Sequence, residues 1–187
     1  MKHFASKLLV ATCVVANIAQ VALWGNEVPP GAVEVDNFRW WQLLTYMWWH
    51  GGPLHLLVNL SVLWAFAPAV EERIGEPGLI GGYLICGIAS AWLALDLLPA
   101  GHIVVGSSGA VFGIIAIYCV MNLRCRIKWI FWPRPIPTWV LLVLLAIIEG
   151  VVWWQELPAG AIHLAGLLEG ICLGVGCLIG KKICPLK

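Results

Sequence analysis

Six stretches of the chain are almost wholly apolar, and short segments rich in glycine and proline separate them. A helix needs roughly 20 apolar residues to cross a bilayer, and each stretch is close to that length. The predicted spans cover residues 6–24, 53–70, 78–98, 106–123, 136–154 and 160–180. Turn residues stand at the breaks, at 29–31, 75–78, 99–101, 133–137 and 158–160. The pattern predicts an all-α polytopic membrane protein, a bundle of six transmembrane helices.

Composition supports this interpretation and excludes several functions. The chain is 61% hydrophobic and 11% charged, with a mean hydropathy of +0.89, whereas a soluble domain carries about 25% charged residues. We expect one membrane domain over residues 1–187, with no room for a separate soluble module. A net charge of +1 argues against nucleic acid as a partner. Seven scattered cysteines lack ligand spacing and are expected to pack as small hydrophobic residues. No cofactor and no metal are implied.

The orientation follows from the basic residues, which favour the cytoplasmic side of a membrane. If the N-terminus is cytoplasmic and six spans follow, Arg39 is the one basic residue of the eleven in the sequence that lies on the outer side of the membrane. The ten others are Lys2, Lys7, Arg73, Arg124, Arg126, Lys128, Arg134, Lys181, Lys182 and Lys187. Tryptophans such as Trp40, Trp41, Trp48, Trp49, Trp129, Trp132, Trp153 and Trp154 gather near the span ends, as in interfacial belts. We expect an integral protein of a bacterial inner membrane with both termini cytoplasmic. The alternative for residues 1–24 is a cleaved signal peptide, although the apolar stretch is long for one.

Polar groups within a membrane span are costly and mostly functional or paired, and four of those in the predicted spans share a common depth. Counting from the cytoplasmic charges at about 1.5 Å per helical residue places Ser108 and His55 at a height of roughly 24 Å. The same count gives roughly 27 Å for His163 and roughly 18 Å for Asn59. Three spans thus bring these side chains to one layer below the outer surface of a hydrocarbon core about 30 Å thick.

These residue types fit acyl transfer. Serine is a weak nucleophile that needs a base within hydrogen-bond reach, and His163 is the only histidine on a later span than Ser108. His55 and Asn59, at i and i+4, share one helix face and are candidate oxyanion donors. Ser108 opens its span, where backbone N–H groups are unsatisfied and favour an anion. The structural alternatives are a helix N-cap for Ser108, a buried hydrogen-bonded histidine for His163 and an interhelical bond for Asn59.

Small residues predict that the serine and histidine helices touch. Gly166, Gly170 and Gly174 follow His163 at i+3, i+7 and i+11, on its own face. Gly109, Ala110 and Gly113 offer a matching small surface after Ser108. Many membrane helices carry such glycines, and the phase of this ridge relative to His163 is what makes it informative.

The carboxylates predict a dyad rather than a triad. No aspartate is positioned to orient His163, and Glu169 lies about 240° around the helix from it. Glu149 lies roughly 22 Å above Arg134, near the height of the site. We expect Glu149 to line a water-filled cavity or to contact the substrate.

The ordered motifs resemble the rhomboid family of intramembrane serine proteases, over roughly residues 40–175. They are G-x-S-G at 106–109, H-x-x-x-N at 55–59 preceded by His50, the His163 to Gly166 segment followed by Gly170, and E-x-R-x-G at 71–75.

The resemblance implies that Ser108 is the nucleophile and His163 the general base. It implies that His55 and Asn59 stabilise the oxyanion with the Ser108 backbone N–H, and that His50 holds the first loop. Substrates would be single-span membrane proteins cut near the outer face. Two positions depart from the family pattern: its Trp-Arg pair is Trp41-Gln42 here, and the ring expected to stack on the histidine is Phe112 rather than tyrosine.

Three other functions are considered. A rhombosortase-like enzyme would trim C-terminal membrane anchors, and an inactive rhomboid-like protein would bind membrane helices without cleaving them. A transporter is disfavoured because no charged pathway or inverted repeat is visible. His102 receives no chemical role, and Glu71 with Arg73 is expected to form an ion pair or a helix-end cap. The sequence leaves the oligomeric state open.

Overall fold

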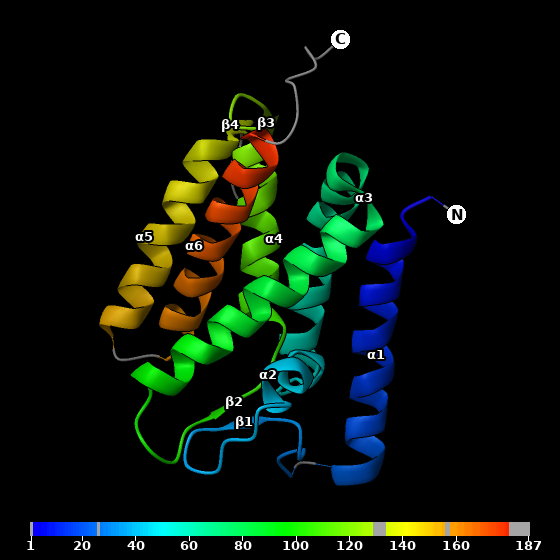
Figure 1. Cartoon of the computed structure of the whole chain (residues 1–187), viewed down its shortest axis with the longest axis vertical. Helices are drawn as coiled ribbons and strands as arrows, with labels where there is room; N and C mark the ends of the chain where they lie inside the picture. Colours follow the sequence, from blue (N-terminus) through cyan, green and yellow to red (C-terminus); the bar gives the residue numbers. More distant parts are fainter. Residues whose placement is uncertain (1, 26, 129–133, 156–157, 180–187) are drawn as a thin grey trace.

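The computed structural model describes residues 2–25, 27–128, 134–155 and 158–179, and these form a helical bundle (Figure 1). Its long helices are α1 (Phe4–Trp24), α3 (Pro53–Leu97), α4 (Ser108–Met121), α5 (Thr138–Trp154) and α6 (Pro158–Ile179). The predicted all-α membrane bundle is confirmed, with the second and third predicted spans joined in α3. Some predicted features lie outside the described residues: the belt positions Trp129 and Trp132, the turn residue Pro133, the end of the last span at 180, Cys184, and the basic residues Lys181, Lys182 and Lys187.

The break predicted at 75–78 is confined to a single residue. Gly75 has φ 79° and ψ 170°, a left-handed conformation inside α3 that glycine adopts without a steric penalty. Pro77 follows within the first turn of the second half, where its missing N–H would have no helical partner in any case. Gly75 therefore divides α3 into two rods that run in different directions, as Figure 1 shows.

Short elements cover the two ends of the bundle. At one end are β1 (Val33–Glu34), α2 (Gln42–Thr45), a 3₁₀ turn (Tyr46–Trp48) and β2 (Ile103–Val104), and β1 pairs antiparallel with β2. At the other end, β3 (Arg126–Ile127) pairs antiparallel with β4 (Ile136–Pro137). The start of α1 and the end of α6 lie at the β3–β4 end (Figure 1). An even number of crossings requires this arrangement.

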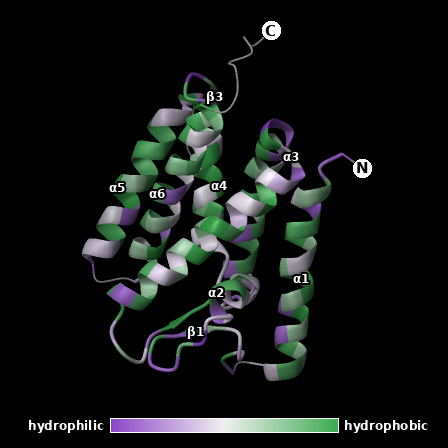
Figure 2. Cartoon of the chain, viewed as in Figure 1, coloured by the Kyte–Doolittle hydropathy of each residue, from purple (hydrophilic) through white to green (hydrophobic). Residues whose placement is uncertain are grey.

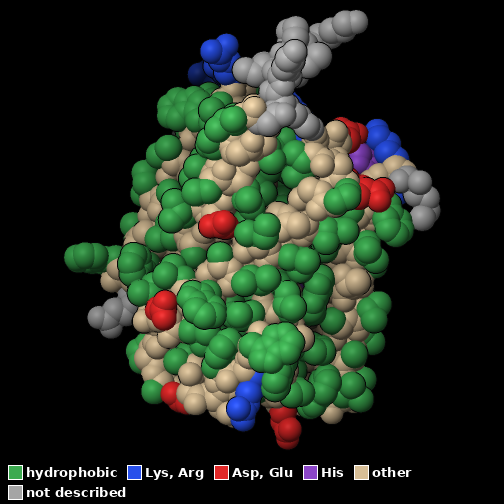
Figure 3. Space-filling view, in the orientation of Figure 1, with side chains coloured by type: hydrophobic (Ala, Val, Ile, Leu, Met, Phe, Trp, Pro, Cys, Tyr) green, Lys and Arg blue, Asp and Glu red, His purple; other side chains and the backbone are tan. Residues whose placement is uncertain are grey.

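The sides of the bundle are mostly apolar, with a few acidic side chains on the face drawn in Figure 3, and the Lys and Arg side chains lie at its ends (Figures 2 and 3). Among the described residues, α1, α3 and α6 are long and apolar enough to cross a membrane. α4 and α5 are apolar but shorter, at 14 and 17 residues. A 14-residue helix extends about 21 Å, less than the roughly 30 Å of a hydrocarbon core. One or both ends of α4 must therefore lie below a membrane surface.

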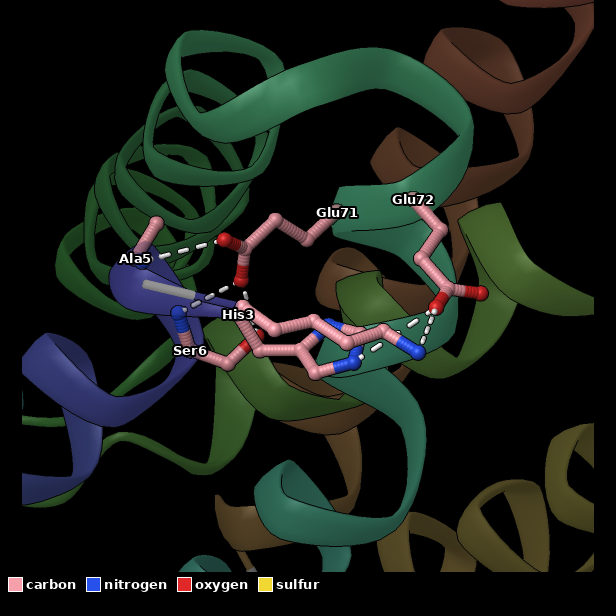
Figure 4. A network of polar contacts seen from close by, with 6 residues as sticks. His3, Ala5, Ser6, Glu71 and Glu72 are labelled. Atoms are coloured by element: carbon pink, nitrogen blue, oxygen red, sulfur yellow. Dashed lines mark hydrogen bonds and ion pairs between the residues drawn. The ribbon is translucent and has the colours of Figure 1, made fainter.

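Glu71 caps the start of α1 from the end of the first half of α3 (Figure 4). Its carboxylate accepts hydrogen bonds from the Ala5 N–H at 3.1 Å, the Ser6 N–H at 2.8 Å and the Ser6 hydroxyl. These N–H groups belong to the first turn, which lacks helical acceptors and carries the positive end of the helix dipole. The helix-end cap predicted for Glu71 is observed.

Two further contacts close the same end of the bundle. Glu72 pairs with Lys2 at 3.3 Å and with His3 at 3.5 Å (Figure 4). Arg73 donates to the Asn122 side-chain oxygen at 2.9 Å and so joins α3 to the end of α4. Polar side chains thus tie α1, α3 and α4 together where the bilayer would end.

α4 and α6 pack backbone against backbone through their glycines. A Cβ at Gly166 would collide with the Gly109 carbonyl, and a Cβ at Gly170 would collide with the Gly113 carbonyl. One at Gly174 would lie 2.8 Å from Val120 Cβ. The predicted small-residue ridge is confirmed, and it sets the separation of the two helices that carry Ser108 and His163.

The glycine ridge predicts that Gly170→Ala is destabilising and Gly176→Ala is not. A Cβ at Gly170 meets backbone and Ala116 Cβ at 2.8 Å, whereas one at Gly176, on the same helix, meets nothing within 4 Å. Forcing atoms into a packed contact costs about 1–3 kcal/mol. We expect a clear fall in the thermal unfolding midpoint of the purified protein in detergent for Gly170→Ala alone. Equal midpoints for the two variants would contradict the importance of this contact.

Candidate active site

Ser108 is the first residue of α4, and the loop before it is held firmly. The N-cap is Ser107, so Ser108 does not serve as the cap, and its side chain is half-buried. Gly106 has φ 114°, a conformation that favours glycine, and its N–H donates to the Tyr46 carbonyl at 3.1 Å. The pairing of β2 with β1 holds the same loop. The hydroxyl therefore stands at a helix N-terminus, directly after a loop that hydrogen bonds hold in place.

His163 lies beside the first turn of α4. Its ring stacks on Phe112, with centroids 4.3 Å apart and an interplanar angle of 10°. Phe112 is one helical turn after Ser108, on the same face. The structure thus brings the predicted serine and histidine to neighbouring positions. Within the described ranges no hydrogen bond joins Ser108 to His163, and such bonds are often long in unliganded sites and shorten when substrate binds.

The other edge of the His163 ring contacts a carboxylate. His163 Nδ1 is 2.8 Å from Glu149 Oε2, and the two side chains are 17% and 10% exposed. Glu149 comes from α5, which packs beside α6 (Figure 1). The prediction that His163 has no acidic partner is therefore wrong. Periodicity within α6 correctly excluded Glu169, but the partner comes from a different helix.

His55 packs over the loop that precedes Ser108. A Cβ at Gly106 would lie 2.6 Å from His55 Cε1 and 2.9 Å from Nε2, so only glycine admits the ring there. The Gly51 N–H donates to His55 Nδ1 at 3.3 Å. With Nδ1 accepting, the neutral ring carries its proton on Nε2, the nitrogen nearest Gly106. His55 is thus a donor at this loop, whereas His163, with Nδ1 donating to Glu149, keeps a free lone pair on Nε2.

Asn59 is buried one turn below His55 on the same face of α3. Its amide nitrogen donates to the His55 carbonyl at 3.1 Å. This bond uses one of the two amide N–H groups. Donation of the other N–H to an oxyanion stays a prediction.

His50 connects the first loop to the serine loop. It is 1% exposed, and its Nδ1 accepts from the Asn17 amide at 3.0 Å while its Nε2 lies 3.3 Å from the Ser107 hydroxyl. Gln20 holds the His50 backbone by two hydrogen bonds, at 2.9 and 3.0 Å. The ring therefore links α1 to the residue adjacent to Ser108.

Gln42 and His102 make local contacts in the outer loops. Gln42 is 3% exposed and its side-chain oxygen accepts the Arg39 N–H at 2.8 Å. His102 Nδ1 lies 2.9 Å from the Pro99 carbonyl. The buried Gln42 thus makes a local contact with the backbone of its own loop.

Comparison with known proteins identifies the family. The Rhomboid domain matches residues 37–179, a range that holds Ser108, His163 and the residues around them but leaves out Asn17 and Gln20 of α1. The chain belongs to the rhomboid family. The match begins in the first loop and ends with α6, so it covers the loop, the serine helix and the histidine helix together.

Several rhomboid relatives share moderate identity with the chain. YdcA of Bacillus subtilis (strain 168) is 35% identical over 103 residues, which are 55% of this chain and 52% of the relative. RHOMBOID-like protein 2 of Arabidopsis thaliana is 30% identical over 155 residues, which are 80% of this chain and 47% of the relative. Rhomboid protease GlpG of Salmonella typhi is 26% identical over 171 residues, which are 89% of this chain and 60% of the relative. The chain spans about half the length of most of these relatives.

Sequence reasoning missed the role of Glu149 because the contact joins two helices. The depth of Glu149 in the membrane suggested that it lies near the site. The sequence of α5, however, does not indicate which of its faces packs against α6. The same holds for Asn17 and Gln20, which meet His50 from α1. Their polarity within a predicted span is the one signal that could have singled them out, and no role was predicted for either.

The buried His50 predicts a loss of stability in acid. Burial, reinforced by the nearby His55 ring, lowers the pKa of His50 to about 4, against about 6.5 in an unfolded chain. Between these values the unfolded chain binds a proton that the folded one does not. Stability is therefore lost as pH falls from about 6.5 to 4, by up to about 3 kcal/mol.

Thermal unfolding of wild type and His50→Gln between pH 7.5 and 4.5 checks this prediction. The variant should be less stable at neutral pH and less sensitive to acid. His102→Gln, in an outer loop, is the control, and its unfolding midpoint should fall with pH as the wild-type midpoint does. If the midpoint of His50→Gln also fell as steeply as that of wild type, His50 would not be the source of the acid sensitivity.

Proposed function

We propose that this chain is an intramembrane serine endopeptidase that cleaves transmembrane segments of other membrane proteins. Membership of the rhomboid family supports the class, and one relative carries the name rhomboid protease. The observation that carries the proposal is the stacking of His163 on Phe112, one turn from the helix-opening Ser108.

In this mechanism Ser108 Oγ attacks the scissile carbonyl and its proton passes to His163 Nε2. The same proton then passes to the leaving amine, which departs with the C-terminal part of the substrate. Water next attacks the acyl-enzyme, gives a proton to His163 and releases the new carboxyl group. His163 finally returns the proton to Ser108. No cofactor takes part in these steps.

The oxyanion would lie at the start of α4. The backbone N–H groups of the first turn have no helical acceptors and point toward it. The Nε2–H of His55 faces the same loop, and the second N–H of Asn59 is the other side-chain donor that we assign. Each such donor contributes about 10²–10³-fold to the rate in other acyl-transfer enzymes.

We place the site below the outer surface of a bacterial inner membrane, with both termini cytoplasmic. The basic residues favour this orientation, and the short α4 supports a nucleophile within the hydrocarbon layer. Substrates would be single-span proteins that enter from the bilayer. The whole of residues 1–187 would act as one membrane domain.

The proposal predicts that Ser108→Ala abolishes cleavage. Loss of the nucleophile should reduce the rate to background, a fall of at least about 10³-fold. The assay uses purified protein in liposomes with a panel of single-span reporter substrates, and product termini are identified by mass spectrometry. His163→Ala should be equally inactive.

Ser61→Ala is the matched control, because Ser61 is also a serine within a span but bonds to the Leu57 carbonyl of its own helix. It should cleave at the wild-type rate. A fluorophosphonate should label wild type and Ser61→Ala, and not Ser108→Ala. Cleavage by Ser108→Ala would refute the proposal, and cuts restricted to C-terminal anchors would favour the rhombosortase-like alternative.

A further inference from the structure

Glu149 is a buried carboxylate in the middle of an apolar environment. It stands on α5 among leucine, isoleucine and valine, and the residue is 8% exposed. Burying an acidic side chain within a membrane span costs free energy, and such side chains usually face a partner inside the protein. The partner described for Glu149 is His163, at 2.8 Å from Oε2 to Nδ1.

We propose that Glu149 is a positioning residue that completes a Ser108–His163–Glu149 triad. This inference rests on the proposed function and adds a third side chain to it. Glu149 acts on His163 alone and touches neither the substrate nor the reacting atoms.

Two contacts fix the His163 ring in different ways. Stacking on Phe112 sets the plane of the ring, since the two rings lie 10° from parallel at 4.3 Å. The stacked phenyl ring offers no hydrogen bond, so it leaves rotation within that plane and the tautomer undetermined. The carboxylate decides both, because an acceptor at Nδ1 requires the proton to reside there.

The tautomer matters for the direction of proton transfer. With the proton on Nδ1, the lone pair on Nε2 is available to accept the Ser108 proton. After the transfer, the ring is a cation whose Nδ1–H still donates to the Glu149 carboxylate. The negative charge of Glu149 opposes the positive charge of the ring, which favours the transition state. The Nδ1 proton stays in place, and the proton from Ser108 goes on to the leaving amine.

Holding α5 against α6 does not require this carboxylate. A Cβ at Gly160, in the first turn of α6, would lie 2.6 Å from the Glu149 carbonyl and 2.9 Å from Trp153 Cα, both in α5. This contact between backbones already joins the helices one turn or less from Glu149. The Glu149 carboxylate, which lies against His163 Nδ1, is therefore available to orient the ring and is not needed to hold the two helices together.

The experiment compares Glu149→Gln and Glu149→Asp with Glu169→Gln as the matched control. Glu169 is also an acidic residue within a span, but it lies about 240° around α6 from His163 and so on another face. Steady-state cleavage in liposomes gives kcat and KM, and ¹⁵N NMR of labelled histidine reports the protonated nitrogen of His163, assigned by its loss in His163→Ala.

Glu149→Gln should lower kcat by roughly 100-fold or more with KM changed by less than about threefold, as removal of the orienting acid does in other triads. A glutamine can donate to Nδ1, so the spectrum should shift from the Nδ1–H to the Nε2–H form. Glu149→Asp keeps the acceptor and should recover at least about tenfold of the lost kcat. Glu169→Gln should match wild type in kcat and in the spectrum.

A Glu149→Gln variant with kcat within about threefold of wild type would overturn the inference. So would an Nε2–H ring in the wild-type protein, a measurement that needs no variant to fold. Either result leaves the proposed function intact when Ser108→Ala is inactive. Cleavage by Ser108→Ala instead refutes the proposed function, whatever the tautomer of His163.

Discussion

The backbone contact between α4 and α6 is the constraint on which the rest of the site depends. Glycines at 109, 113, 166 and 170 let the two helices approach until side chains no longer separate them. Nothing hydrophobic drives helices together in lipid, so close packing of this kind supplies the association. The contact fixes the separation of the two helices, and thereby places a histidine beside the first turn of a helix that opens with serine.

Three histidines around this contact receive different properties from their partners. His55 accepts from a backbone N–H and presents a donor. His163 donates to a carboxylate and presents an acceptor. His50 is buried, with both ring nitrogens facing polar groups of other segments. Identical side chains thus present a donor, an acceptor and a structural link, because the tautomer of an imidazole follows the group at its other nitrogen.

Irregular backbone near the site requires its own support. The loops that flank α2 and the loop that precedes α4 contain backbone N–H and C=O groups, and lipid offers these groups no hydrogen-bond partners. The β1–β2 pair, the Gly106 to Tyr46 bond and the bond from the Tyr46 hydroxyl to the Gly87 carbonyl at 2.6 Å provide partners. These bonds hold the serine loop without relying on the charged residue that Gln42 replaces.

The sequence by itself determined the six spans, the candidate nucleophile and base, the glycine ridge and the family, since each depends on length, periodicity or local spacing. It also identified the two positions that differ from the family pattern, Gln42 and Phe112. Tertiary structure alone decided that Gly75 is the whole of the break in α3, that Gln42 bonds within its own loop, and that Glu149 meets His163. That last contact depends on how α5 is rotated against α6. Glu149 is a single acidic residue in an otherwise apolar stretch, so no repeating pattern of polar positions records the rotation or names the partner.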